Sequence, residues 1–134
     1  MRYLSLLPMF CVASVASLQA EPVSIEALPP VEVKTVPVAG DGAVDPATKE
    51  IRVTFSKNML TEKMWSLVTV SRETFPKIDG QMKYLPDKRT FVAPVKLEPG
   101  RTYALWINQG RFTSFRDAVD NPAVPYLLVF HTRK

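Results

Sequence analysis

Short runs in which apolar and polar residues alternate recur along this chain, and turns containing proline or glycine separate them. In one run Ile51, Val53 and Phe55 share one face and Arg52 and Thr54 the other, the two-residue period of a half-buried strand. The runs cover residues 31–36, 50–56, 67–71, 81–85, 89–95, 103–108 and 126–132. This spacing predicts an all-β chain, and an antiparallel β-sandwich of about seven strands with Greek-key connections suits it best. An open barrel of the OB or jelly-roll kind would fit the same spacing.

The turn before the run at 103–108 gives the sandwich a more specific form. Pro99 presets the φ of one central turn position, and Gly100 supplies the positive φ that a type II turn needs at the next. Tyr103 then begins the strand, where its hydroxyl can reach back to a main-chain group upstream and fix a structural corner. A tyrosine at this place in the penultimate strand is typical of an immunoglobulin-like sandwich.

Two segments break the strand rhythm. Residues 57–65 place Met59, Leu60, Met64 and Trp65 near helical spacing over one or two turns, which predicts a short helical connection. Residues 21–30 contain three prolines without periodicity and predict an extended lead-in or linker. The expected organisation is therefore a linker at 21–30 followed by one immunoglobulin-like domain at 31–134.

The first twenty residues predict a secretory signal peptide. Arg2 precedes a largely apolar stretch, and small residues allow cleavage after Ala20 or after Ser17. An uncleaved anchor or a lipoprotein modified at Cys11 are the alternatives, and Cys11 is the only cysteine of the chain. We therefore expect an exported protein, periplasmic or at the cell surface, with no stable membrane insertion after cleavage.

Charge and motifs exclude several function classes. The net charge is +4, and the 17 basic residues are interleaved with 13 acidic ones, so no stripe suited to nucleic acid emerges. His131 is the only histidine and lies in a predicted strand, and the chain has no nucleophile elbow or phosphate-binding glycine loop. We expect neither an enzyme nor a cofactor.

One loop gathers oxygen ligands. Asp117, Asp120 and Asn121 lie within five residues, a cluster that could hold Ca²⁺ if further oxygens joined it. Asp and Asn in turns more often bond to their own main chain, so we expect a turn and keep calcium as the weaker alternative.

An apolar outer face is the more suggestive feature. If Tyr103, Leu105 and Ile107 point into the core, then Trp106 points out, together with Leu127 and Val129 on the last strand. Such a face needs cover. We expect the long loop with Phe112 and Phe115, or the Trp65 segment, to pack over it. The alternative is a contact face for a protein, a cell-surface polymer or a second copy in a weak homodimer, formed by Trp106, Leu127, Val129, Phe112 and Phe115.

Several segments together resemble a known family. They are residues 33–45, the run Thr54-Phe55-Ser56 followed by Met59, the corner at 97–103, the stretch at 117–122 and the closing Phe130-His131-Thr132. In this order they resemble the bacterial Ig-like domain of the S-layer (SbsA) type. The family usually carries glycine where this chain has Asp120.

The resemblance implies a non-catalytic module with a structural, adhesion or protein-binding accessory role. A second hypothesis is a small carbohydrate- or ligand-binding sandwich that uses Trp65, Trp106, Phe112 and Phe115 as an exposed aromatic platform. The solvent exposure of these four side chains separates the two.

Overall fold

Every regular element in the described part of the protein is a strand. The computed structural model describes residues 8–13 and 23–134, and this part of the chain contains no helix. The strands are β1 (Glu32–Val36), β2 (Glu50–Phe55), β3 (Leu67–Thr69), β4 (Lys77–Ile78), β5 (Lys83–Tyr84), β6 (Thr90–Lys96), β7 (Thr102–Ile107) and β8 (Tyr126–His131).

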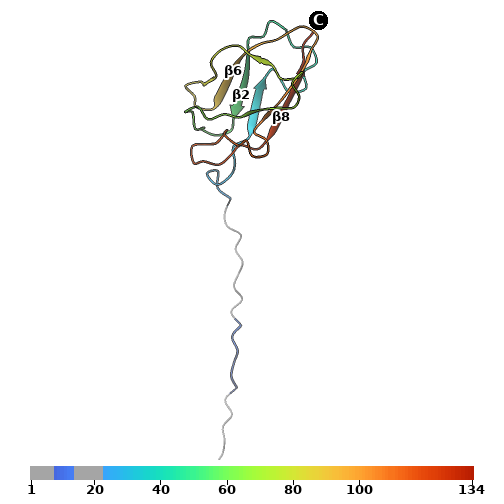
Figure 1. Cartoon of the computed structure of the whole chain (residues 1–134). Coiled ribbons are helices and arrows are strands. Elements are labelled where there is room, and N and C mark those ends of the chain that lie inside the picture. The colour runs from blue at the N-terminus through green and yellow to red at the C-terminus, as the bar shows by residue number, and fades with distance from the viewer. Residues whose placement is uncertain (1–7, 14–22) are drawn as a thin grey trace, which may run out of the picture.

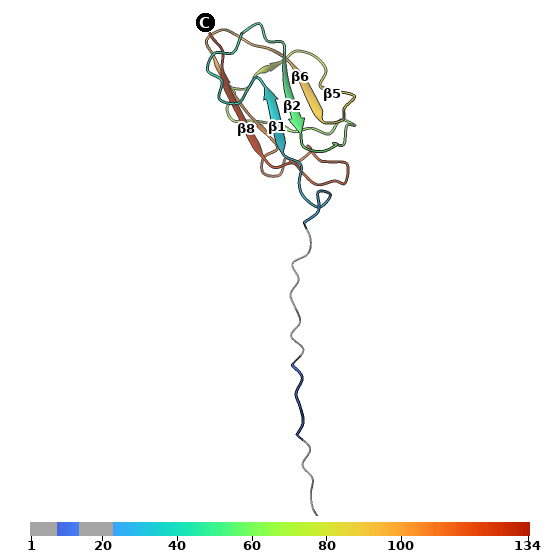
Figure 2. The ribbon, with the colours of Figure 1, turned by 180° about the vertical axis from the view of Figure 1, so that it is seen from behind.

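The strands form two antiparallel sheets that pack face to face (Figures 1 and 2). In the first, β1, β2 and β6 follow one another, and β4 and β5 both pair with the far side of β6. The second has the order β3-β7-β8. The chain crosses between sheets from β2 to β3, from β3 to β4 and from β6 to β7, which is Greek-key connectivity. The predicted immunoglobulin-like sandwich is confirmed.

A proline explains why the strand beside β6 is interrupted. Ile78 pairs with Val95 and Lys83 with Val92, so four residues of one strand face only two of the other. Pro94 lies at this gap, and it has no N–H to donate to a neighbouring strand. The gap is therefore a bulge opposite Pro94, and a bulge is one of the few places where a sheet accommodates proline.

The segment after β1 changes sheets. The chain leaves β2 at Val36 and then runs along β8, where Gly40 N–H donates to the Val129 carbonyl at 2.7 Å. Val44 and Thr132 form a parallel bridge a few residues further on. Residues from the N-terminal third of the domain thus border both sheets: β1 lies at the edge of the first, and residues 40–44 run along β8 of the second.

The core lies between the sheets and follows the predicted alternation. Ile51, Val53 and Phe55 are buried, as are Tyr103, Leu105 and Ile107. Three phenylalanine rings fill the centre, since Phe115 packs on Phe55 and on Phe91. Burial of this apolar core is the main favourable term in folding, and the described residues contain no disulfide that would add to it.

The predicted helix at 57–65 is wrong. Met59 is buried, and its N–H donates to the Lys88 carbonyl at 2.8 Å, while Leu60 N–H donates to the Arg116 carbonyl at 2.9 Å. These bonds to distant segments use the donors that a helix would need and hold the backbone in an irregular conformation. The apolar residues of segment 57–65 that reach the core pack there one by one and do not form the face of a helix.

Candidate interaction surface

The outer face of the β3-β7-β8 sheet carries the apolar residues that the alternation placed there. Trp106 lies between Val68 of β3 and Leu127 of β8, and Ala104 lies opposite Val129. Val68, Trp106 and Val129 are half-buried, and Leu127 is 40% exposed. We call Val68, Trp106, Leu127 and Val129 the outer face.

The residues expected to cover this face lie elsewhere. Phe115 is 0% exposed, and its ring centroid lies 5.0 Å from that of Phe91 between the sheets, so its assignment to a contact surface is wrong. Trp65 also packs on Phe91, at 5.6 Å. Phe115 and Trp65 therefore do not cover the outer face, and the four aromatic side chains do not form one platform. Phe112 remains 49% exposed at the tip of the turn after β7.

Asn108 is the residue that directs Phe115 inward. Its side chain is fully buried; Oδ1 accepts from Phe115 N–H at 3.0 Å, and Nδ2 donates to the carbonyls of Phe115 and Ala123 at 2.9 and 3.1 Å. The Ser66 hydroxyl donates to the same Oδ1 at 2.6 Å. A buried amide with its partners satisfied fixes the loop in one conformation. The sequence signal was an asparagine that follows the last apolar residue of a strand.

The corner fixes the position of β7 against β8. The Tyr103 hydroxyl accepts a hydrogen bond from Glu98 N–H at 2.8 Å, and Gly100 has a φ of +66°. The Thr132 hydroxyl donates to the Glu98 carbonyl and accepts from Arg101 N–H. This is the geometry expected of the turn through Pro99. It sets which β7 residues face outward, Trp106 included.

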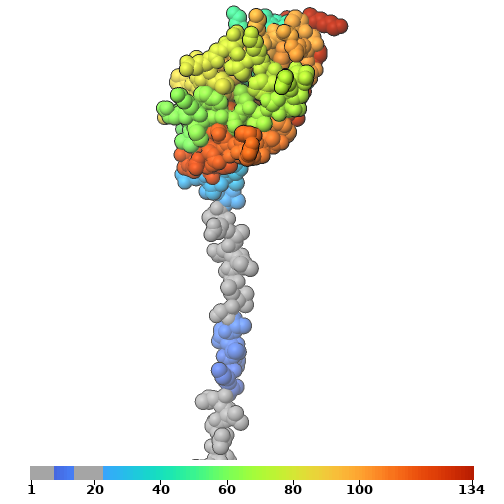
Figure 3. All heavy atoms as spheres, viewed as in Figure 1, coloured from blue at the N-terminus to red at the C-terminus, as the bar shows by residue number. Residues whose placement is uncertain are grey.

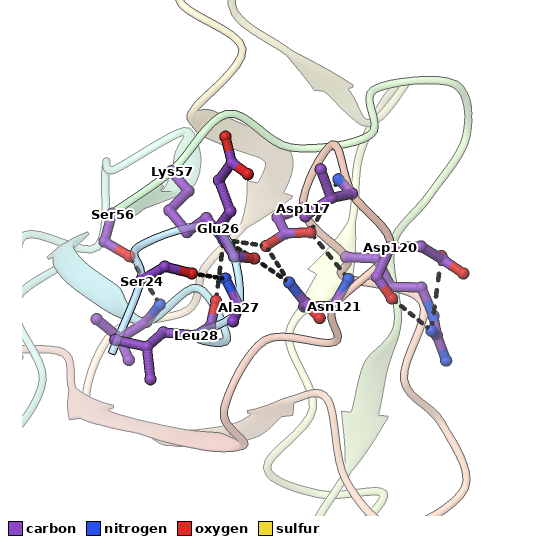
Figure 4. A network of polar contacts seen from close by, with 12 residues as sticks. Ser24, Glu26, Ala27, Leu28, Ser56, Lys57, Asp117, Asp120 and Asn121 are labelled. Atoms are coloured by element: carbon purple, nitrogen blue, oxygen red, sulfur yellow. Dashed lines mark hydrogen bonds and ion pairs between the residues drawn. The ribbon is translucent and has the colours of Figure 1, made fainter. Parts of the chain in front are cut away.

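The Asp117 loop is built as a turn, and calcium is not supported there. Asp117 is buried, and its carboxylate accepts from Val119 N–H, from Asn121 N–H and Nδ2, and from the Lys57 ammonium (Figure 4). Asp120 points to solvent with 72% of its side chain exposed. Its φ of 71° lies in the left-handed region, which glycine adopts without the strain of a side chain.

Electrostatics explain why the buried Asp117 stays ionised. Burial by itself would raise the pKa of the carboxyl, but hydrogen bonds from Lys57, from Asn121 and from the Val119 main chain outweigh it, so the pKa is lowered. Internal donors, one of them a cation, therefore occupy the oxygens that a metal ion would need.

The described part of the lead-in is bound to the domain. The Lys57 ammonium also donates to the carbonyls of Leu28 and Glu26, at 2.9 and 3.3 Å, and Asn121 Nδ2 donates to the Glu26 carbonyl at 2.8 Å (Figure 4). Pro30 is buried, and its carbonyl accepts from Val124 N–H. Residues 24–30 are thus held against the sandwich and form a turn at 25–28, where an extended lead-in or linker was expected. They meet the sandwich at the end opposite the C-terminus (Figure 1).

Other candidate chemistry is sparse. His131 shares a hydrogen bond of 2.8 Å with the Thr102 hydroxyl on the outer surface of the sheet. Within residues 8–13 and 23–134, no three His, Cys, Asp or Glu side chains lie close enough to hold a metal ion. The same residues include no helix of the length and apolarity needed to cross a membrane. The predicted signal peptide falls largely on residues outside the described part.

Comparisons with known proteins agree with this architecture. The sequence model of the bacterial Ig-like domain family matches residues 26–132. The structure of domains 1–6 of the surface layer protein SbsC has a TM-score of 0.50 at 20% identity, over 81% of this chain and 14% of that one. A crystal structure of the S-layer protein rSbsC gives 0.49 at 19% identity, over 80% and 14%. At such identities the likeness concerns the fold. No curated protein matches the sequence.

Proposed function

The chain belongs to the bacterial Ig-like domain family, and from this premise we propose that it is an exported, non-catalytic module that contacts a protein through its outer face. The module acts in the periplasm or at the cell surface and has a structural or adhesive role. SbsC, whose domains it resembles in fold, is a surface layer protein, and this supports a structural role outside the cytoplasm.

The observation that carries the proposal is the state of the outer face. Trp106 lies at its centre with an aliphatic residue on each side. Two of the three aromatic residues expected to cover it, Trp65 and Phe115, pack on Phe91 instead. A contiguous apolar patch on a small domain marks a site of association. Tryptophan is among the residue types enriched at the centres of protein interfaces and among their hot spots.

The anchoring of the domain supports the same role. Lys57 and Asn121 hold the main chain at Glu26 and Leu28, so the polypeptide enters the sandwich along a defined path. The tyrosine corner fixes the sheet that bears the outer face. A surface presented in one orientation loses little conformational entropy when it binds.

Retention of a partner by outer-face variants tests the proposal. The exported protein, tagged at the exposed C-terminus, is crosslinked with formaldehyde in the cells that naturally make it and then purified. Leu127→Asp is expected to abolish a discrete crosslinked species, because it places a charge within the apolar outer face, directly beside Trp106. Val33→Asp is the matched control, since Val33 is 59% exposed on β1 of the other sheet.

The two variants separate the outcomes. Loss with Leu127→Asp and retention with Val33→Asp support the outer face, and light scattering of the purified protein shows whether the species is a homodimer. Equal retention in both variants and the parent contradicts the proposal.

A further inference from the structure

A second surface, remote from the outer face, has the form of a ligand cleft. It lies between the connection that follows β2 and the segment of β5 and its turn, on the left flank of the domain in Figure 3, and encloses about 540 Å³. This volume is within the range of small-ligand sites. We propose that this cleft binds an acidic polysaccharide, with a sugar ring on Trp65 and the carboxylates on three lysines.

The walls of the cleft are formed before any ligand arrives. The Tyr84 hydroxyl donates to the Met64 carbonyl at 2.9 Å and so joins the two segments. Below them, Met59 N–H donates to the Lys88 carbonyl at 2.8 Å. In the turn, the Asp87 carboxylate accepts from Arg89 N–H and from Thr90 N–H and hydroxyl. Because these bonds order both walls, binding would not have to order them.

The floor of the cleft is aromatic and rigid. Trp65 and Tyr84 both pack on the buried ring of Phe91, with centroids 5.6 and 5.5 Å away, and both line the cleft with their exposed parts. Met82 lies beside them and is also half-buried. The apolar face of a pyranose ring packs well on such a surface, since an aromatic ring offers a large apolar area and its hydrogen-bonding tip stays at the edge.

The rim of the cleft carries a positive charge that the described residues leave unneutralised. Lys63, Lys83 and Lys88 line it, against the single acid Glu62, which gives a net charge of +2. Within residues 8–13 and 23–134, none of the three ammonium groups lies within 4.0 Å of a carboxylate. This charge favours an anionic ligand.

Two of these lysines have a backbone conformation that is uncommon for residues with a side chain. Lys63 has a φ of 54° and Lys88 a φ of 60°, both in the left-handed region. Glycine or asparagine adopts this region with less strain than lysine. Strained residues of this kind cluster at functional sites.

Calorimetric titration of the exported, processed protein with trigalacturonate tests the site. The matched probe is the same trisaccharide with its carboxylates methyl-esterified. We expect the acid to bind and the ester to bind about tenfold more weakly or not at all, because the ester keeps the ring surface and loses the charges. Absence of binding by the acid, or equal binding of the two, overturns the proposal.

Two sets of variants locate the binding. Lys63→Asn, Lys83→Gln and Lys88→Asn together should weaken binding about tenfold, by analogy with exposed ion pairs. The control removes the same charge from lysines exposed outside the cleft: Lys34→Gln, Lys49→Gln and Lys134→Gln. An equal loss in both sets would mean diffuse surface charge and would overturn the site.

A third variant tests the stacking, and a second ligand tests the class of polymer. Trp65→Leu should lower the affinity in a protein whose unfolding transition still shows a folded domain; unchanged affinity overturns the role of Trp65. A glutamate peptide of the same charge should bind more weakly than trigalacturonate, and equal affinity overturns the assignment to a polysaccharide. Because the cleft and the outer face share no residue, failure of one leaves the other standing.

Discussion

Replacing Glu32 with glutamine should remove a pH dependence of stability that one buried carboxyl creates. Glu32 begins the edge strand β1 and faces inward opposite Phe55. Its Oε1 is buried and finds no hydrogen-bond partner within the described chain. Burial raises the pKa of the carboxyl from 4.5 to about 7, and the main-chain N–H of Glu32 offsets only part of this effect.

The direction follows from proton linkage. Between pH 4.5 and 7 the unfolded chain has lost this proton and the folded chain retains it, so stability falls as pH rises through that interval and levels off above it. The pKa difference corresponds to about 3 kcal/mol. Because Glu32 is only partly buried, solvent screening reduces the expected loss to about 1–2 kcal/mol.

Urea unfolding at pH 4.5 and pH 8 measures the effect. From pH 4.5 to pH 8 the parent should lose about 1–2 kcal/mol more unfolding free energy than Glu32→Gln, because glutamine does not ionise. Glu73→Gln, at an exposed position, should show no such shift. A constant difference for Glu32→Gln would refute the assignment of a raised pKa to this residue.

Two further outcomes follow from the structure and a third from the sequence. Tyr103→Phe should lower the unfolding free energy by about 1–2 kcal/mol, because Glu98 N–H loses its partner; no change in urea unfolding would mean that the corner hydrogen bond contributes nothing. Asn108→Ala should cost about 2–4 kcal/mol, since it leaves buried main-chain groups unpaired, and hydrogen exchange should rise at Phe115 first; a stability equal to the parent would contradict this. N-terminal sequencing of the exported protein should place the first residue after Ala20 or Ser17, and an intact Met1 would contradict the predicted signal peptide.

The strands could be predicted from sequence because each strand buries one face, which makes apolar and polar residues alternate along it with a period of two. The corner was readable because turn chemistry is local. The face of β1 was not, since a bulge between Glu32 and Lys34 inserts one extra residue and turns Glu32 and Thr35 inward while Val33 and Val36 stay exposed.

The candidate site was predictable in part for a similar reason. The outward position of Trp106 was predicted correctly, because the alternation within its own strand decides on which side of the sheet it lies. The path of the long loop depends on Asn108, which bonds to groups 7 and 15 residues away, and no local pattern encodes such bonds. The capture of the lead-in depends on Lys57 and Asn121, whose partners at Glu26 are 31 and 95 residues distant. Sequence periodicity therefore could not predict the path of the long loop or the position of the lead-in, because polar contacts between distant segments determine both.

Site-specific photocrosslinking tests the proposed contact surface most directly. A photoreactive phenylalanine analogue is placed at Leu127, on the outer face, or at Val33, on the opposite sheet, in the exported protein within its own cells. The account predicts a discrete protein adduct from position 127 and none from position 33, and Trp106→Ser should remove the adduct. Equal adducts from both positions, or none from position 127, would contradict a protein contact at the outer face.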